Sequence, residues 1–360
     1  MINLNDMIKQ QIVSCFGRGE FENLFSALVG DVNKLFIVHG HKSYQACGAK
    51  DLVNDVTRGM QVVEFDDFTE NPKKEDVVVG VTFLKQVRPD LIVAIGGGSV
   101  MDMAKLIRFY AQHRVPLLAI PTTAGTGAES TQFAVCYING VKHSINDSSI
   151  LPDRVILYPP LTYNNNRYLT SCTGFDALAQ AIESYWNINA TTESDKYAFR
   201  AIEKIYSVLI KNELSAEDRA VLIRGANDAG RAINITRTTV PHALSYTLTS
   251  KYGYPHGHAV ALSFPFFLKY NLDGSADSFR GNDYKHYMAK MNQLRSILNV
   301  GDDPFAVMKE FICHLGLGFD PKRDFDDQVV ACGLNLERAG NTPIAIDKDV
   351  IISAVQSIRN

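Results

Sequence analysis

The stretch Pro89-Asp-Leu-Ile-Val-Ala-Ile95-Gly96-Gly-Gly-Ser-Val-Met-Asp102 decides the fold of this 360-residue chain. An apolar run of strand length leads into three glycines, and a helical pattern follows from Met101 to Gln112. A buried strand that turns tightly into a helix is the repeating unit of a parallel sheet with helices on its faces. The first half contains further apolar runs that predict strands, at residues 34–38, 61–65 and 115–120. We therefore predict an α/β domain over residues 1–160.

Ligands of such sheets bind at the carboxyl ends of the strands. Three turns at those ends carry glycine or hydroxyl residues: His39-Gly40, Gly96–Ser99 and Thr122-Thr123. Glycines let backbone N–H groups approach an anion closely, and a helix N-terminus adds partial positive charge. This predicts a bound pyrophosphate, with a nicotinamide dinucleotide as the expected ligand. The spacing matches neither G-x-G-x-x-G nor a P-loop, so a turn needed only for packing is the alternative.

The turn at Gly40 bears on the choice between NAD and NADP. Many NAD sites place an acidic residue after the first strand to bind the ribose 2′-hydroxyl. Here the turn reads His39-Gly40-His41-Lys42-Ser43, with no acid. This favours NADP(H), with the 2′-phosphate bound by His41, Lys42 or Ser43, although use of both cofactors stays open. The alternative is that these are solvated turn residues.

From Pro160 onward the strand pattern stops, and residues 161–360 are predicted to form an all-helical domain. Asp176 and Gln180 lie four residues apart and share one helix face, with Glu183 on the same side. On one straight helix His242 and His256 would be separated by roughly 21 Å. Gly253-Tyr-Pro255 breaks the helix just before His256, so the two imidazoles can meet.

These side chains predict a metal site. Asp176, His242 and His256 would be three good ligands of one divalent ion, with Gln180 as a weaker, neutral fourth and an open position for substrate. Fe²⁺ and Zn²⁺ suit such ligands about equally. The alternatives are ordinary polar histidines near helix ends and a helix N-terminal acid at Asp176.

Composition narrows the class of protein. The formal net charge is −3, which gives no indication of a nucleic-acid partner. No apolar run reaches membrane-spanning length, and the first residues lack the basic start of a signal peptide. Six scattered cysteines predict reduced thiols in a cytoplasmic protein rather than a disulfide framework. We expect a homodimer or higher homo-oligomer acting on a small molecule.

Four motifs together resemble the iron-containing (group III) alcohol dehydrogenases, in matching order from about residue 30 to residue 275: Gly96–Lys105, Pro121–Glu129, Thr173–Glu183 and Pro255–Gly257. The resemblance implies a Rossmann-like domain followed by a helical metal domain, as in dehydroquinate synthase, with the active site in the cleft between. It implies Fe²⁺ or Zn²⁺ on Asp176, Gln180, His242 and His256. Gly97, Gly98 and Ser99 would hold the pyrophosphate, with Asp102 beside the nicotinamide ribose. Further cofactor contacts would come from Gly40, Ser43, Thr122, Thr123, Thr131 and Lys142.

Two positions depart from the family pattern. The family usually has His at Gln180, and usually has a second His at Tyr246, which is often assigned to proton relay. The first departure bears on metal identity and affinity. The second moves the relay to Tyr246, to His258 or to metal-bound water.

The departures resemble a subgroup, the phosphonoacetaldehyde reductases. Three stretches carry this likeness: Asp176–Trp186, Ala232–Tyr246 and Pro255–Leu262. A substrate phosphonate needs cationic and hydroxyl donors near the metal, and Arg237, Thr238 and Lys251 are expected to supply them. Solvated helix-end charges are the alternative interpretation of Arg237 and Lys251.

The resulting hypothesis is NAD(P)H-linked reduction of a small aldehyde, with phosphonoacetaldehyde and its product 2-hydroxyethylphosphonate as the favoured pair. One alternative is another small-alcohol or polyol dehydrogenase of the same family. A second is a lyase resembling 3-dehydroquinate synthase, which would recycle a bound NAD.

Overall fold

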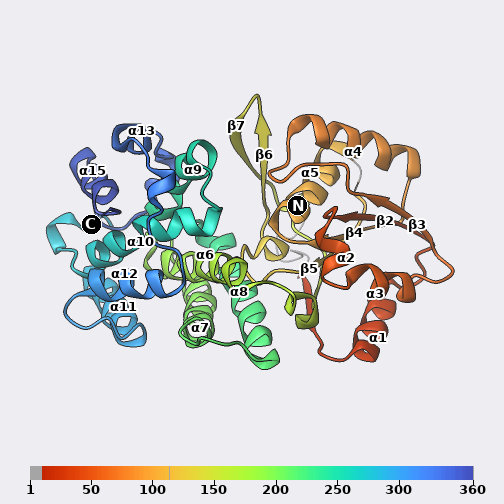
Figure 1. Ribbon diagram of the computed structural model, residues 1–360, viewed down its shortest axis with the longest axis horizontal. Coiled ribbons are helices and arrows are strands. Elements are labelled where there is room, and N and C mark those ends of the chain that lie inside the picture. The colour runs from red at the N-terminus through yellow and green to blue at the C-terminus, as the bar shows by residue number, and fades with distance from the viewer. Residues whose placement is uncertain (1–9, 113, 360) are drawn as a thin grey trace, which may run out of the picture. The chain divides into compact units, whose positions relative to one another are not determined.

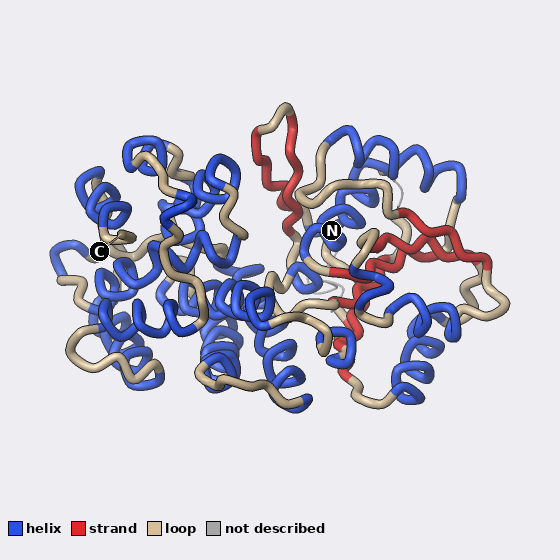
Figure 2. The backbone as a smooth tube through the Cα atoms, viewed as in Figure 1, coloured by secondary structure: helices blue, strands red, loops and turns tan. Residues whose placement is uncertain are grey.

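The structure is a computed structural model that describes residues 10–112 and 114–359, and it divides into two compact units. The first unit is the chain up to Asn165 together with Ser215–Ile223. The second is Asn166–Leu214 together with the chain from Arg224 onward. Figure 1 labels the elements, and Figure 2 shows that strands are confined to the first unit in the part of the chain described.

The first unit contains the strands β1 (Gln11–Ser14), β2 (Lys34–His39), β3 (Gln61–Phe65), β4 (Leu91–Gly96), β5 (Leu117–Pro121), β6 (Phe133–Ile138), β7 (Val141–Asn146) and β8 (Arg154–Leu157). Its helices are α1 (Arg18–Val29), α2 (Ser43–Ala46), α3 (Ala49–Val56), α4 (Lys74–Val87) and α5 (Gly98–Ala111).

The second unit is built from α6 (Arg167–Trp186), α7 (Thr192–Leu209), α9 (Val240–Tyr252), α10 (His256–Leu272), α11 (Tyr284–Ile297), α12 (Pro304–His314), α13 (Asp327–Cys332), α14 (Leu336–Ala339) and α15 (Lys348–Gln356). Helix α8 (Ala216–Thr236) contributes its first residues to the first unit and the rest to the second.

Six strands form one parallel sheet in the order β1-β8-β5-β4-β2-β3. Helices cover both faces, with α4 and α5 on one side and α1 to α3 on the other (Figure 1). The alternation of side chains along a strand produces this arrangement, since successive residues face opposite sides. On β4, Val93 and Ile95 pack with Phe21 and Phe25 of α1, and the whole strand is buried.

Strand register aligns the three predicted ligand-binding turns. His39 pairs with Ile95, and Gly96 pairs with Pro121. The ends of β2, β4 and β5 therefore lie next to one another at one edge of the sheet. The prediction that these turns share an edge is confirmed.

The pattern analysis missed four strands. β1 and β8 pair at one side of the sheet, and β6 and β7 form an antiparallel hairpin. The hairpin did carry a sequence signal: Asn139-Gly140 joins the two strands, and both residues have positive φ, at 51° and 77°. A two-residue loop with φ above zero at both positions is the type I′ turn that Asn-Gly favours.

Three further observations bear on the sequence predictions. All six cysteines are free thiols. No helix in the described part of the chain is long and apolar enough to cross a membrane. The predicted helix break before His256 is present, because α9 ends at Gly253 and α10 begins at His256.

Truncating a core residue of the sheet should destabilise the protein. Leu118 on β5 is fully buried, and Leu118→Ala leaves a cavity between the sheet and α1, so we expect a loss of about 2–5 kcal/mol in the free energy of unfolding. Urea titration followed by far-ultraviolet circular dichroism measures the loss. Val79→Ala on α4 is the control, because Val79 is 50% exposed and should change stability by less than about 0.5 kcal/mol. Equal losses in the two variants would contradict the assigned core.

Candidate metal and cofactor sites

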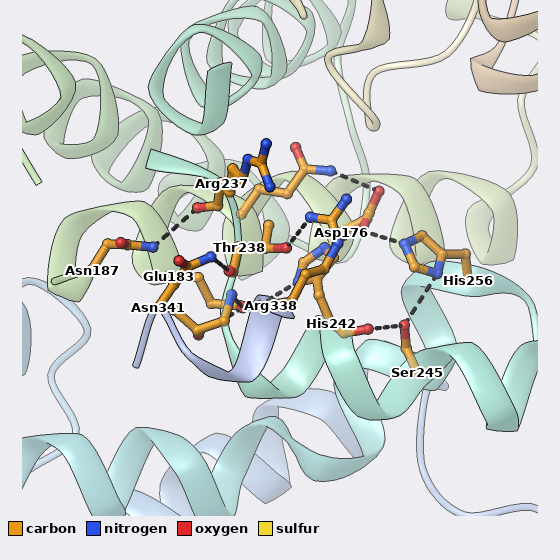
Figure 3. A network of polar contacts seen from close by, with 12 residues as sticks. Asp176, Glu183, Asn187, Arg237, Thr238, His242, Ser245, His256, Arg338 and Asn341 are labelled. Carbon is orange, nitrogen blue, oxygen red and sulfur yellow. Dashed lines mark hydrogen bonds and ion pairs between the residues drawn. The ribbon is translucent and has the colours of Figure 1, made fainter. Parts of the chain in front are cut away.

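Three predicted metal ligands converge in the second unit. One ligand atom from each of Asp176, His242 and His256 lies within 4.8 Å of the others. His242 Nε2 is 3.1 Å and His256 Nε2 is 3.8 Å from Asp176 Oδ1. The imidazole ring centres are 5.5 Å apart, and Figure 3 shows the three side chains pointing toward one another.

Local helix geometry explains this convergence. Asp176 and Glu183 are separated by two turns of α6, so both face the same side. At the end of α9, Gly253 adopts a left-handed conformation with φ of 70° and its N–H bonds to Leu248 O. The chain then turns through Pro255, and α10 begins with His256. A Cβ on Gly257 would stand 1.9 Å from the carbonyl oxygen of Cys172 on α6, so only glycine permits this close approach.

A carboxylate that the sequence did not assign to this role orients His242. Glu183 is completely buried, and its Oε1 accepts the hydrogen bond from His242 Nδ1. Its Oε2 accepts from the N–H of Thr239 at 2.6 Å and from the Thr239 hydroxyl at 2.8 Å. A proton held on Nδ1 leaves Nε2 facing Asp176, which is the tautomer that a metal ligand requires. The spacing of Asp176 and Glu183 placed them on one face but gave no sign of this pairing.

His256 is oriented in a similar way. The Ser245 hydroxyl donates to the carbonyl oxygen of His242 at 2.8 Å, so its oxygen can accept from His256 Nδ1 at 3.4 Å. That arrangement again directs Nε2 toward Asp176. Each imidazole therefore has a hydrogen-bond partner behind it, as metal-binding histidines usually do.

The charges of this cluster favour a cation. Burial lowers the pKa of His242, but the carboxylates of Glu183 and Asp176 outweigh burial and raise it to about 9. Without a metal, a proton on His242 thus supplies positive charge between the two acids. A divalent ion displaces that proton, so metal affinity should rise with pH until His242 is neutral.

Gln180 lies beside the three ligands. Its Nε2 donates to Asp176 Oδ2 at 3.1 Å, and its Oε1 is buried without a hydrogen-bond partner among the described residues. An unpartnered buried acceptor is costly. An oxygen with this environment fits a position next to a cation. Two imidazoles, one carboxylate and this oxygen are a donor set that suits Fe²⁺ or Zn²⁺.

The two candidate proton donors differ in surroundings. His258 is buried, its Nε2 donates to the carbonyl oxygen of Gly318 at 2.8 Å, and its Nδ1 lies 2.8 Å from the Tyr168 hydroxyl. Burial lowers the pKa of His258, which favours the neutral ring that accepts from Tyr168. Tyr246 lies one turn after His242 on α9, and burial raises the pKa of its phenol. Tyr168, 42% exposed, had not been expected at the site.

In the first unit, the predicted pyrophosphate turn has a form suited to an anion. Helix α5 begins at Gly98, and no side chain caps its N-terminus. The N–H groups of Gly97, Gly98 and Ser99 donate no hydrogen bond to another described residue. A Cβ on Gly97 would stand 3.3 Å from Thr123 Oγ1, and one on Gly98 would stand 2.9 Å from Thr126. The free donors and the lack of side chains fit a pyrophosphate group.

The other predicted cofactor residues surround this turn. Thr122 N–H donates to Gly96 O at 3.0 Å, which joins β5 to the turn. Asp102 on α5 accepts from Val135 N–H at 3.1 Å; burial raises its pKa to about 6, although Lys105 and Lys142 oppose the rise. Thr131 accepts from the buried Lys105 ammonium at 3.1 Å. Lys142 lies on β7, opposite Tyr137 in the hairpin.

The turn after β2 contacts an acid from the end of β3 that the sequence analysis did not expect. Gly40 packs tightly against Ser43, because a Cβ on Gly40 would stand 2.3 Å from Ser43 Oγ. His41 Nδ1 lies 2.8 Å from Asp66 Oδ2, immediately after β3. The sequence placed no carboxylate at this turn, but the neighbouring strand supplies one. The sequence analysis favoured NADP because no acid follows the first strand. Asp66 lies beside that turn, so the absence of an acid there no longer supports NADP over NAD.

Comparison with known proteins agrees with this geometry. The profile "Iron-containing alcohol dehydrogenase" matches residues 13–159, and "Fe-containing alcohol dehydrogenase family, C-terminal" matches residues 170–314. The chain belongs to the iron-containing alcohol dehydrogenase family. The predicted family, fold class and enzyme class are confirmed. So are the cofactor types that go with the family, a nicotinamide dinucleotide and a divalent metal.

The relatives differ in the substrate that their names give and in the share of this chain that aligns with them. Phosphonoacetaldehyde reductase of Streptomyces viridochromogenes is 34% identical over 52% of this chain and 55% of that protein. NADPH-dependent butanol dehydrogenase of Clostridium saccharobutylicum is 28% identical over 93% of each chain. The crystal structure of an iron-containing alcohol dehydrogenase from Thermotoga maritima has a TM-score of 0.81 at 26% identity, covering 98% of this chain and 99% of that one. The chain spans 36% to 62% of the length of the first three curated relatives.

Replacing Gly98 should weaken cofactor binding without affecting the metal. In Gly98→Ala the new methyl group crowds Thr126 and obstructs the first turn of α5, so we expect the Kd for NADPH to rise by about 10-fold or more. Fluorescence titration with NADPH measures the change. Gly19→Ala on α1 is the matched control, since a Cβ there meets nothing within 4 Å. Unchanged NADPH affinity in Gly98→Ala would place the pyrophosphate elsewhere.

Replacing Glu183 should weaken the metal site from behind. In the wild type, three groups donate hydrogen bonds to the Glu183 carboxylate. In Glu183→Gln, an amide N–H₂ replaces one carboxylate oxygen and cannot accept such a bond. When this N–H₂ faces His242, the carboxylate no longer fixes the proton on Nδ1. We expect metal affinity to fall by about 10- to 100-fold. Competition with a chelator measures the affinity for Zn²⁺. Glu203→Gln, at an exposed position of α7, is the control. Wild-type affinity in Glu183→Gln would show that the carboxylate serves packing only.

Proposed function

We propose that this protein reduces a small aldehyde to the alcohol with NAD(P)H, and that its preferred substrate is phosphonoacetaldehyde. The observation that carries the reaction type is the convergence of Asp176, His242 and His256, two of them buried and His256 partly buried. The substrate rests on the match to phosphonoacetaldehyde reductase. It also rests on the resemblance of the stretches around Gln180 and Tyr246 to that subgroup.

The candidate metal ligands and the glycine turn have separate roles in this proposal. Asp176, His242 and His256 would hold the divalent ion, with Gln180 Oε1 next to it, while Gly97, Gly98 and Ser99 would hold the pyrophosphate. When bound, the ion supplies Lewis-acid polarisation of the carbonyl group and the nicotinamide supplies the hydride. Glu183 retains the Nδ1 proton of His242 and so keeps Nε2 available as a ligand atom.

A proton must also reach the product oxygen. Both ring nitrogens of His258 are engaged, Nδ1 with the Tyr168 hydroxyl and Nε2 with the carbonyl oxygen of Gly318, so its one N–H is already bonded to the backbone. Tyr246 follows His242 by one turn of α9 and carries a phenolic proton. We assign the relay to Tyr246.

A second candidate is a neutral short-chain alcohol or aldehyde. The butanol dehydrogenase match favours it, because that alignment covers 93% of each chain rather than about half. A lyase resembling dehydroquinate synthase has less support, since the alcohol dehydrogenase profiles match both halves of the chain.

One assay separates these candidates. Purified protein is stripped with a chelator, reloaded with Fe²⁺ or Zn²⁺, and given NADPH or NADH with phosphonoacetaldehyde or with propanal. We expect no oxidation of the reduced cofactor before reloading, and afterwards a kcat/KM for phosphonoacetaldehyde at least about 10-fold above that for propanal. A preference for propanal would favour the neutral-alcohol function. Full turnover in the stripped protein would contradict the metal assignment.

A further inference from the structure

Arg338 is a positively charged side chain near the metal cluster that the sequence patterns did not single out. It lies on the short helix α14, and its backbone N–H is held by Asn335 Oδ1 at 2.9 Å. Its Nη1 donates to the Thr238 hydroxyl at 2.7 Å. The guanidinium carbon lies 5.8 Å from the ring centre of Tyr246, and its charge and hydrogen bond lower the pKa of that phenol against the effect of burial.

These two contacts place Arg338 at the N-terminal part of α9, which carries His242. Thr238 lies just before α9, four residues ahead of His242, and Tyr246 follows His242 by one turn of the helix. The two contacts of Arg338 therefore lie on either side of His242 in the sequence. Figure 3 shows the hydrogen bond from Arg338 to Thr238. The Thr238 backbone is itself fixed, because its carbonyl oxygen accepts from Asn341 Nδ2 at 2.9 Å.

The charge of Arg338 is not neutralised by the protein. In the described part of the chain, no carboxylate lies within ion-pair distance of its guanidinium, although the group is half-buried. Its neighbour Glu337 pairs with Arg237 instead. The buried Arg108, by contrast, meets Asp153 at 2.8 Å. A guanidinium with a hydroxyl and a phenol as partners keeps N–H groups for an anion.

We propose that Arg338, supported by Thr238, binds the anionic headgroup of the substrate and determines its specificity. This rests on the proposed function, and it names the side chain that would select an aldehyde carrying a phosphonate. A guanidinium matches the paired oxygens of a phosphonate in a two-point hydrogen bond. The two basic residues expected from sequence are less well placed. Arg237 is paired with Glu337, and Lys251 is exposed and lies nine residues beyond His242, roughly 14 Å along the helix axis.

The test compares a charged and an uncharged substrate in variants of the metal-loaded protein. In Arg338→Gln we expect kcat/KM for phosphonoacetaldehyde to fall by about 10- to 100-fold, mainly through KM. Propanal turnover should fall by a much smaller factor, through the lost contact with Tyr246. Arg338→Lys should recover part of the loss, because it retains the charge without the paired donors. Arg295→Gln is the matched control, since Arg295 is also half-buried but pairs with Asp273 on the surface.

A second measurement keeps the inference separate from the proposed substrate. Ethylphosphonate cannot be reduced, and its inhibition of propanal turnover reports headgroup binding alone. We expect it to inhibit the wild type competitively and to inhibit Arg338→Gln at least about 10-fold less well. If the wild type does not reduce phosphonoacetaldehyde yet shows this difference in inhibition, the proposed substrate is wrong and the role of Arg338 stands. Equal inhibition of both proteins, or an equal loss of both aldehydes in Arg338→Gln, overturns the role of Arg338.

Discussion

The metal cluster depends on one buried carboxylate, that of Glu183. A carboxylate with no exposure to water is costly unless donors surround it. Here the Thr239 N–H, the Thr239 hydroxyl and His242 Nδ1 supply those donors. Because the acid is on α6 and all three donors are at the beginning of α9, satisfying the acid also fixes these helices together. The same contact that compensates a buried charge thereby brings His242 to Asp176.

The third ligand arrives by a different physical route. His256 is brought back by a helix break and by close packing rather than by an ion pair. Gly253 permits the left-handed end of α9, and Gly257 lets α10 approach the Cys172 carbonyl on α6. Neither glycine carries chemistry, but each provides a backbone position that a side chain would obstruct. The cluster therefore combines an electrostatic constraint on one histidine with a steric constraint on the other.

The sequence predicted the features that depend on residues close together in the chain, and it missed those that depend on contacts between distant segments. Buried parallel strands such as β4 are continuous apolar runs, which made the sheet predictable. The glycines that follow β4 are adjacent to it in the sequence, which made the ligand-binding edge predictable. β1 has no such run, because its residues are exposed or only partly buried, and the pattern missed it. The convergence of Asp176 with the two histidines was predictable from a helix break, and the nearness of Gln180 to Asp176 from helix spacing. Arg338 was not, because its place depends on α14 packing against α9, about 100 residues after Thr238, for which the sequence has no local signal.

The charges around the cluster also bear on the role of a glutamine at residue 180. Asp176 and Glu183 together carry two negative charges, and the raised pKa of His242 shows that they favour a cation between them. A neutral amide at residue 180 offers an oxygen without adding or removing charge. It also donates to Asp176 Oδ2, which leaves Oδ1 as the oxygen nearest both imidazoles. In the proposed site, attraction for an ion would thus come from the acids, while Gln180 orients the Asp176 carboxylate. With the charge supplied in this way, the guanidinium of Arg338 would be available to meet the charge of the proposed substrate.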